Sequence, residues 1–172
     1  DSMDIGDNSM EWRSFLTDEP AVAFADTPSD VWYATASGMG AYSKKTNVKR
    51  VFTSLGKFDA QGIADMAADK RGGIWIATAQ GVAYSSDGKK FKTYTKKSGL
   101  PASAVTGLHV ARDGTGWVGT RKGAGAFSGS WRAFTRSQGM CGDQIRDIDS
   151  DDRGGVWFAT NAGVCVYRSG QW

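Results

Sequence analysis

Short apolar runs separated by glycine-rich turns extend along most of this chain, and the stretch between residues 105 and 135 shows them most clearly. Residues 105–111 are rich in apolar side chains, and the polar residues 112–116 that follow include two glycines. Apolar residues return at 117–120 and at 124–128, and a last run covers 131–135. Runs of this length bounded by glycine predict strands, and the short turns between them predict an antiparallel meander of four strands.

The same unit recurs four times, and each copy carries a Trp followed three residues later by a Thr. The aligned segments are residues 30–38, 73–81, 115–123 and 155–163. Their tryptophans, which are separated by 43, 42 and 40 residues, are Trp32, Trp75, Trp117 and Trp157. A four-stranded unit of about forty residues is typical of a propeller blade. Because a lone sheet of this size leaves both faces wet, we expect these tryptophans to pack between neighbouring blades.

These repeats predict an all-β fold, a β-propeller of four blades with four antiparallel strands each, in a single domain over residues 1–172. The blades are expected at about residues 21–59, 63–97, 105–137 and 145–172. The last unit stops at Trp172, before most of its outer strand, and residues 11–15 resemble the missing strand. We therefore expect the N-terminal segment to complete the last blade and close the ring.

Two alternatives to closure within one chain stay open. The chain could be a piece cut from a longer propeller, or it could form a dimer that pools eight blades. Dimerisation through Trp12 or Trp172 would make it a structural assembly module.

The units resemble the two-component regulator propeller repeat, in which an Asp-x-x-Gly turn precedes an apolar-Trp-apolar strand that ends in Gly-Thr or Ala-Thr. Residues 69–78, 113–120 and 152–160 fit this pattern, whereas the first unit has Thr27 to Asp30 in place of the Asp and Gly. The resemblance implies a bacterial sensor or ligand-binding propeller that works outside the cytoplasm. It does not imply a ligand, because the matching residues are structural.

Composition and charge narrow the classes of partner. The chain has 23 Gly but only 3 Pro, which fits many short strands joined by glycine turns. Its net charge is +3, and the basic residues are scattered, so we expect no nucleic-acid partner and a weak preference for acidic ones. No apolar run is long enough for a transmembrane helix. The acidic N-terminus does not resemble an export signal. The resemblance to sensor propellers implies a periplasmic or secreted chain whose signal has been removed, with a cytoplasmic location as the alternative.

The two cysteines, Cys141 and Cys165, stand 24 residues apart and match no metal-binding spacing. They could be free thiols, with Cys165 packing as a small apolar residue. They could also form one disulfide, which would imply an oxidising compartment. The sequence indicates neither a metal site nor a cofactor.

Common hydrolase, P-loop and metalloprotease motifs are missing from the sequence. The single histidine, His109, lies in the inner strand of the third unit, where it could line a channel or, with Asp147 or Asp149, serve a propeller lyase or hydrolase. Arg146 lies on the next inner strand. We expect it to pair with Asp65 or Asp147, or else to face an acidic ligand or a polar funnel that holds a cation.

Binding on a rigid scaffold usually resides in its loops. In a propeller, the loops between the second and third strands share a rim with the loops that join the blades. This rim is expected to carry Ser37, Gln80, Arg121, Lys122 and Asn161 from the first set and Lys57, Phe58, Pro101, Met140 and Asp143 from the second.

The sequence therefore favours a non-enzymatic binding or sensor propeller that recognises a protein, glycan or small ligand through one rim. The candidate binding residues are Gln80, His109, Arg121, Lys122, Arg146 and Asn161.

Overall fold

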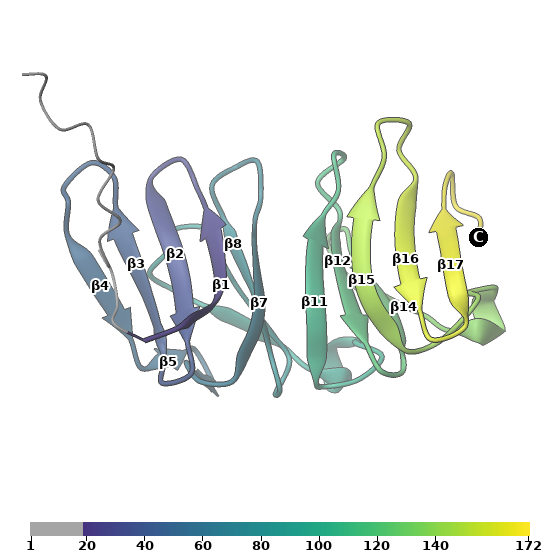
Figure 1. The fold of residues 1–172 in the computed structure, drawn as a ribbon, viewed down its shortest axis with the longest axis horizontal. Helices are drawn as coiled ribbons and strands as arrows, with labels where there is room; N and C mark the ends of the chain where they lie inside the picture. The colour runs from purple at the N-terminus through teal and green to yellow at the C-terminus, as the bar shows by residue number, and fades with distance from the viewer. Residues whose placement is uncertain (1–18) are drawn as a thin grey trace, which may run out of the picture.

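The computed structural model describes residues 19–172 and consists almost entirely of antiparallel strands (Figure 1). Sheet 1 contains β1 (Ala21–Asp26), β2 (Asp30–Thr35), β3 (Met39–Ser43) and β4 (Lys49–Phe52). Sheet 2 contains β7 (Ile63–Ala68), β8 (Ile74–Thr78), β9 (Val82–Ser85) and β10 (Lys92–Tyr94). Sheet 3 contains β11 (Val105–Val110), β12 (Gly116–Thr120), β13 (Gly123–Phe127) and β14 (Trp131–Phe134). Sheet 4 contains β15 (Ile145–Ser150), β16 (Val156–Thr160) and β17 (Gly163–Tyr167).

The connections between sheets contain only small elements. A hairpin of β5 (Ser54–Leu55) and β6 (Phe58–Asp59) links sheets 1 and 2. Single 3-10 turns, η1 (Lys96–Ser98) and η2 (Arg136–Gln138), link the later sheets. Each of the four larger sheets is a meander, as the glycine-bounded runs predict.

The inner strand of every sheet has a bulge at the same place, and this sets the equivalence between sheets. The register shifts once near the start of β1, β7, β11 and β15, at the same place in each strand. The equivalent residues after the shift are Ala23, Asp65, Gly107 and Asp147. The repeat is thus a structural period as well as a sequence period.

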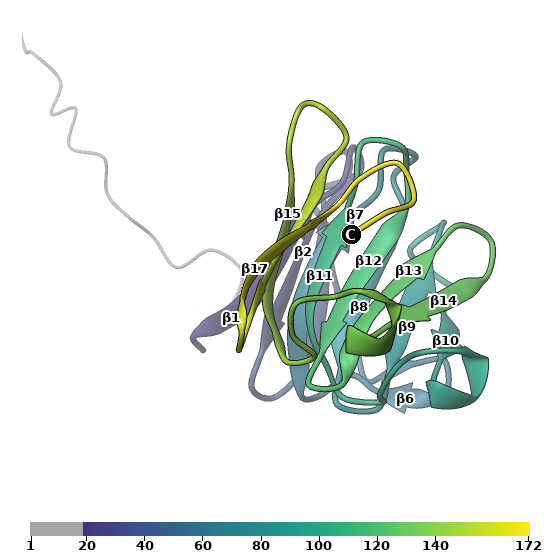
Figure 2. The same cartoon turned by 90° about the vertical axis from the view of Figure 1, so that its right-hand side faces the viewer.

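The four sheets lie in an open, propeller-like arc (Figures 1 and 2). Strand β1 packs against β7, β7 against β11, and β11 against β15, but no comparable packing joins β15 to β1 within residues 19–172. In Figure 1, β4 and β17 lie at opposite ends of the molecule. The expected closed ring is therefore not observed. Residues 11–15, expected to complete the last blade, lie outside the described residues, and sheet 4 has three strands in the described part.

Aromatic side chains fill the junctions between sheets. Trp75 of sheet 2 lies 5.3 Å from Phe127 and 6.0 Å from Trp131 of sheet 3, measured between ring centroids. Interiors pack densely, so these rings fill the space between the two sheets.

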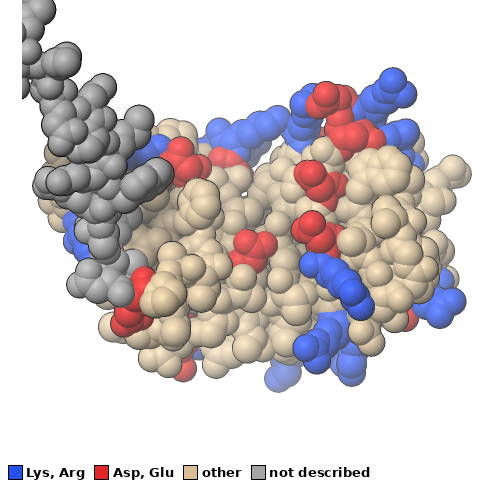
Figure 3. Space-filling view, viewed as in Figure 1, with Lys and Arg blue, Asp and Glu red and all other residues tan. Residues whose placement is uncertain are grey.

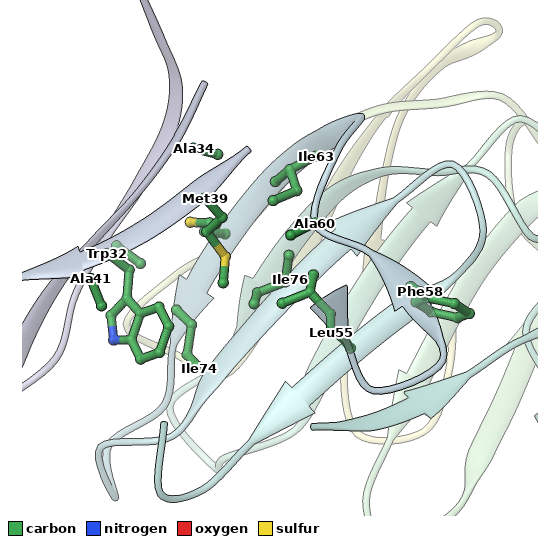
Figure 4. Packing of buried hydrophobic residues seen from close by; sticks show 13 residues of the cluster. Trp32, Ala34, Met39, Ala41, Leu55, Phe58, Ala60, Ile63, Ile74 and Ile76 are labelled. Carbon is green, nitrogen blue, oxygen red and sulfur yellow. The ribbon is translucent and has the colours of Figure 1, made fainter. Parts of the chain in front are cut away.

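Each junction contains one apolar cluster built around a repeat tryptophan. Figure 4 shows the first, where Trp32 and Met39 of sheet 1 point towards Ile74 and Ile76 of sheet 2. Trp75 and Trp117 occupy the second and third clusters. These three tryptophans are 1%, 5% and 3% exposed, whereas Trp157 is 42% exposed. The expected packing role is confirmed for three of the four.

The repeated threonines fix the turns between second and third strands. The Thr120 hydroxyl donates to the Gly123 carbonyl at 2.8 Å and accepts from the Lys122 N–H at 3.0 Å. Thr78 and Thr160 make the same pair of bonds in their own sheets. The buried Thr hydroxyl therefore provides hydrogen-bond partners for backbone N–H and C=O groups of the turn.

Aspartates fix the turns between first and second strands, and here the sequence alignment was wrong by one residue. Asp151, rather than Asp152, accepts hydrogen bonds from the Arg153 and Gly155 N–H groups, both at 2.8 Å. Asp152 instead pairs with Arg112. The extra aspartate in this turn made the two registers indistinguishable by sequence.

Trp172 is half-buried and packs against the third apolar cluster. Its ring lies 5.5 Å from Phe134, 5.2 Å from Phe158 and 5.0 Å from Tyr167. It takes the place in sheet 4 that Trp131 takes in sheet 3 and is only partly exposed. Dimerisation through Trp172, one of the alternatives above, stays a prediction. Trp12 lies outside the described residues.

Candidate functional site

The loops that carry the predicted binding residues share one rim, which we call the lower rim after its place in Figure 1. The Gly123 N–H donates to the Asp143 carbonyl at 2.7 Å, and the Asn161 N–H donates to the Gln144 carbonyl at 3.0 Å. Each bond joins a turn between second and third strands to a connection between sheets. The expectation that these two sets of loops lie together is confirmed.

The lower rim presents four of the predicted residues to solvent, namely Gln80, Arg121, Lys122 and Asn161. The Asn161 side chain is partly engaged, because its Oδ1 accepts from the Gln144 N–H at 3.2 Å. Arg121 and Lys122 take part in no ion pair within residues 19–172. Their turn is held by Thr120, so two free cations stand on a fixed backbone.

Other residues expected on this rim are engaged or buried. The Ser37 hydroxyl donates to both carboxylate oxygens of Glu19, at 2.8 and 2.6 Å, and these bonds lower the pKa of Glu19. Phe58 and Met140 are only 6% and 4% exposed, because their side chains fill the apolar clusters beneath the rim. Phe58 and Met140 therefore belong to the connections of this rim, as expected, but their side chains do not face solvent.

Basic side chains predominate in the loops of the lower rim. Six of them, Lys57, Lys96, Lys97, Arg121, Lys122 and Arg136, compare with three acidic ones, Glu19, Asp59 and Asp143. Figure 3 shows Lys and Arg along the lower edge below sheets 3 and 4, whereas both signs alternate along the upper edge. Several upper-rim charges are paired, including Arg112 with Asp152 and Arg168 with Asp151. The lower rim is thus the basic one.

A disulfide braces this rim. Cys141 in the connection before sheet 4 is bonded to Cys165 in β17, with a Cα–Cα distance of 5.8 Å. The sequence left open whether the two cysteines are free thiols or form a disulfide, and the structure contains the disulfide. The bridge fixes the connection that precedes β15 to the edge of sheet 4.

The polar residues of the inner strands face the middle of the arc. The Asp65 Oδ2 accepts from the Leu108 N–H of the next sheet at 2.8 Å. Burial raises the pKa of Asp65, against the lowering effect of the N–H donors of Leu108 and Met66. Arg146 is exposed, and within residues 19–172 no ion pair joins it to Asp65 or Asp147. Asp65 therefore joins two sheets and does not neutralise Arg146.

His109 lies between sheets 3 and 4. Its Nε2 is 2.8 Å from the Ser150 Oγ, and its Nδ1 is 4.0 Å from the Asp149 Oδ1. Burial lowers the pKa of His109, and the charges of Asp149 and Asp147 act in the opposite direction. A neutral His beside a Ser hydroxyl is the pair a nucleophilic hydrolase needs. The third residue of such a triad would be Asp149, but its side chain is 85% exposed and lies beyond hydrogen-bond distance of the His109 ring.

A groove that was not predicted from the sequence lies on the upper rim between sheets 2 and 3. Its volume is about 570 Å³, and its lining includes Trp75, Tyr84, Arg112 and Phe127. The Tyr84 hydroxyl donates to the Asp69 Oδ2 at 2.8 Å, and burial together with this bond raises the pKa of Tyr84 to about 12. Trp75 and Tyr84 pair across β8 and β9, and this aromatic pair is the sequence feature that could have indicated the groove.

Within residues 19–172, no group of three or more His, Cys, Asp or Glu side chains could hold a metal ion. No helix in that range has the length and apolar character to cross a bilayer.

The fold is similar to several solved structures. The extracellular domain of BT3049 from B. thetaiotaomicron, assigned as a hybrid two-component system, has a TM-score of 0.75 and 19% identity over 91% of this chain and 22% of that one. The computationally designed protein Ika4 has a TM-score of 0.64 and 13% identity over 88% of this chain and 92% of that one. Virginiamycin B lyase from Staphylococcus aureus has a TM-score of 0.62 and 17% identity, over 86% and 55%.

These likenesses establish the propeller-like fold and nothing finer, since identity is low in all three. The chain spans 22% of the BT3049 domain and 55% of the lyase. By sequence, no family model matches, and no curated protein is similar enough to count as a relative.

Proposed function

We propose that this chain is a non-enzymatic binding or sensor module whose lower rim holds an acidic ligand, which can be a protein, a glycan or a small molecule. The observation that carries the proposal is the pair Arg121 and Lys122, two exposed cations without ion-pair partners in the described residues, on a turn fixed by Thr120. Gln80 on the neighbouring sheet supplies an amide on the same rim. A charge-assisted contact to a carboxylate or phosphate is the strong kind of hydrogen bond.

The rigidity of the turn that carries Arg121 and Lys122 also supports a role in ligand binding. The Thr120 bonds and the Gly123 to Asp143 bond leave the backbone of residues 121–122 little freedom. A preorganised turn loses less conformational entropy when a ligand binds. The two long side chains then need only to select rotamers.

An extracytoplasmic setting is part of the proposal. The Cys141–Cys165 disulfide supports it, because disulfides persist in oxidising compartments. So does the likeness to an extracellular sensor-type domain, BT3049. We propose a periplasmic or secreted chain from which an export signal has been removed. Labelling of intact cells with a membrane-impermeant reagent tests this location.

We also propose that residues 11–15 supply the fourth strand of sheet 4, in the same chain or in a second copy. The support is the free edge of β17 in the described residues and the position of Trp172, which matches that of Trp131 at the start of β14. Deleting residues 1–15 should then lower the melting temperature by several degrees, and an unchanged melting temperature would contradict the added strand.

Binding can be tested with an array of acidic glycans and acidic peptides, followed by titration calorimetry of the best ligand. Replacing Arg121, Lys122 and Gln80 with Ala should weaken binding at least tenfold and leave the melting temperature within a few degrees. The matched control, Arg71→Ala with Arg153→Ala, removes the same two charges from exposed turns on the upper rim. Equal affinity of the lower-rim variant and wild type would refute the rim assignment.

A hydrolase or lyase is the second candidate function, favoured by the 2.8 Å contact between His109 Nε2 and Ser150 Oγ. The fold is compatible with such chemistry, because virginiamycin B lyase shares it. In this alternative His109 acts as the general base, with Asp147 or Asp149 stabilising its charged form. A screen with activated esters, comparing wild type with His109→Ala and Ser150→Ala, tests it. Turnover that survives both substitutions would remove the alternative.

A further inference from the structure

Lysine side chains gather on the outer edge of sheets 1 and 2, although they are scattered along the sequence. Residues 43–59 and 87–98, which contain the edge strands β4 and β10, hold ten of the 21 Lys and Arg residues and two of the 18 Asp and Glu residues. We call these two segments the lysine edge. The rest of the chain has 11 basic and 16 acidic residues. The excess of positive charge therefore lies on the lysine edge.

The two segments of the lysine edge form one continuous surface. They line a groove of about 460 Å³, with residues 51–54 and 56 from the first segment and Lys89, Lys90 and Phe91 from the second. A Cβ at Gly56 would lie 2.6 Å from the Phe91 carbonyl oxygen, so the two backbones approach closely. Figure 2 shows β6 and β10 together on the side of the molecule away from β1 and β15.

Most cations of the lysine edge are available to a partner. Lys44 and Arg50 form ion pairs with aspartates of sheet 1, and the Lys49 ammonium lies 5.6 Å from the centroid of an aromatic ring. The other seven are exposed and take part in no ion pair within residues 19–172, namely Lys45, Lys57, Lys89, Lys90, Lys92, Lys96 and Lys97.

The turn that presents Lys89 and Lys90 is fixed by the carboxylate next to it. The Asp87 Oδ1 accepts the N–H groups of Lys89 and Lys90, both at 2.9 Å, and the Ser85 hydroxyl at 3.0 Å. Asp87 thus uses this oxygen to hold the backbone of the turn. The two ammonium groups extend from a fixed backbone next to the groove.

Protection of the edge strands accounts for only part of this charge. Lysines on an edge strand prevent its pairing with another chain, and Lys92 in β10 can serve this purpose. The other six available lysines lie outside the strands. The edge strand of sheet 3, β14, has Arg132 as its one charged residue. The lysine edge therefore carries more charge than its strands need.

The residue types of the lysine edge favour one class of anionic partner. Nine of its ten cations are Lys, whereas recognition of nucleic acid and of single phosphate groups favours Arg. Val48 and Val51, which are 53% and 70% exposed, lie among the lysines. A nucleic acid or an acidic polymer offers no apolar phase to such side chains. An anionic bilayer attracts the ammonium groups and buries the aliphatic groups at the boundary of its acyl chains.

We propose that the lysine edge is a peripheral docking surface for a bilayer that contains anionic lipids. The ammonium groups of Lys89, Lys90 and Lys92 contact the lipid head groups, and Val48 and Val51 enter the boundary with the acyl chains. The inner strands then face away from the membrane (Figure 2). This contact is independent of the proposed ligand, because Arg121 and Lys122 are not part of the lysine edge.

Cosedimentation of the full chain with lipid vesicles tests the proposal. Wild type should bind vesicles of phosphatidylcholine and phosphatidylglycerol in equal parts, should not bind vesicles of phosphatidylcholine alone, and should be released by salt. Replacing three cations with Gln should weaken the binding about a hundredfold when they are Lys89, Lys90 and Lys92. The matched control removes the same charge from exposed turns of the upper rim and should weaken it no more than about twofold. It replaces Lys70, Arg112 and Arg153 with Gln.

The valines separate a bilayer from other polyanions. Val48→Ser with Val51→Ser should lower vesicle binding about threefold or more, because less apolar surface is buried, and should leave any adsorption to heparin unchanged. Val22→Ser is the matched control, since Val22 is 54% exposed but lies in the inner strand β1. It should leave vesicle binding unchanged.

Failure of the docking surface is distinguishable from failure of the lower-rim ligand. The lower-rim variant, in which Arg121, Lys122 and Gln80 are replaced with Ala, should keep vesicle binding within about twofold of wild type. Absence of binding to anionic vesicles, equal binding to neutral vesicles, or equal losses in the two Gln variants would overturn the proposal. So would unchanged vesicle binding after the double valine substitution, or tighter binding to heparin or duplex DNA than to the vesicles.

Discussion

The Asp65 carboxylate in β7 accepts a hydrogen bond from the Leu108 N–H in β11, 2.8 Å away, and so joins two sheets whose backbones do not pair with each other. Asp65→Ala should lower the free energy of unfolding by about 1 to 3 kcal/mol, the cost of leaving a partly buried donor without a partner. Asp65→Asn keeps an acceptor oxygen and should lose less than half of that. Urea denaturation measures both, and equal losses would show that charge matters more than the hydrogen bond.

The His109 imidazole makes stability depend on pH. Burial holds its pKa below the usual 6.5, so the folded state binds fewer protons than the unfolded state in the window below 6.5. Stability should therefore rise as pH increases towards 6.5 and fall as pH decreases below it. His109→Gln should remove this dependence. Because the chain has a single His, one NMR signal reports its titration, and a midpoint above 6.5 would contradict the burial argument.

The Cys141–Cys165 bridge should stabilise the fold measurably, since it closes a loop with a sequence separation of 24. The chain-entropy relation gives roughly 3 kcal/mol for a loop of this length. Reduction should lower the denaturant midpoint, and the Cys141→Ser, Cys165→Ser double variant should match the reduced wild type and show no response to reductant. Identical midpoints for the oxidised and reduced wild type would contradict the bridge.

The repeat was predictable because a packing position recurs with every sheet. The positions of Trp32, Trp75 and Trp117 in their junctions follow from the forty-residue spacing alone. The closed ring did not follow, because the number of sheets in a ring depends on the angle between neighbouring sheets, which a single repeat does not specify. Trp157 has the same sequence signature as the other three and a different environment.

The residues of the lower rim were predicted in part for a similar reason. Strand order places Gln80, Arg121 and Lys122 on one rim, and this needs only the meander. Phe58 and Met140 share that rim but point into the core, because a connection can turn its apolar side chains inward where the clusters leave room. The position of a residue in a loop therefore predicts where its backbone lies, but not where its side chain points.

Gly123, at the turn beside Arg121 and Lys122, provides both a left-handed backbone conformation and room for a close backbone contact. Comparing Gly123→Ala with Gly114→Ala separates these two contributions. Gly123 has a φ of +122°, and a Cβ there would lie 2.2 Å from the Phe134 carbonyl oxygen. Gly114 has a φ of +87°, but a Cβ there would meet no atom within 4 Å apart from its chain neighbours. Gly114→Ala should cost about 1 to 2 kcal/mol, the left-handed conformation of a residue with a Cβ. Gly123→Ala adds a backbone clash and should cost at least about 3 kcal/mol.

The difference between these two losses, measured by urea denaturation, is the contribution of close packing between β13 and the end of β14. If Gly123→Ala cost no more than Gly114→Ala, the turn would have room to move, and the fixed backbone on which the proposed Arg121 and Lys122 contact depends would be absent. Because the Gly123 N–H also donates to the Asp143 carbonyl at 2.7 Å, such movement would open the connection to sheet 4 as well. Ligand affinity should therefore fall in Gly123→Ala and remain unchanged in Gly114→Ala.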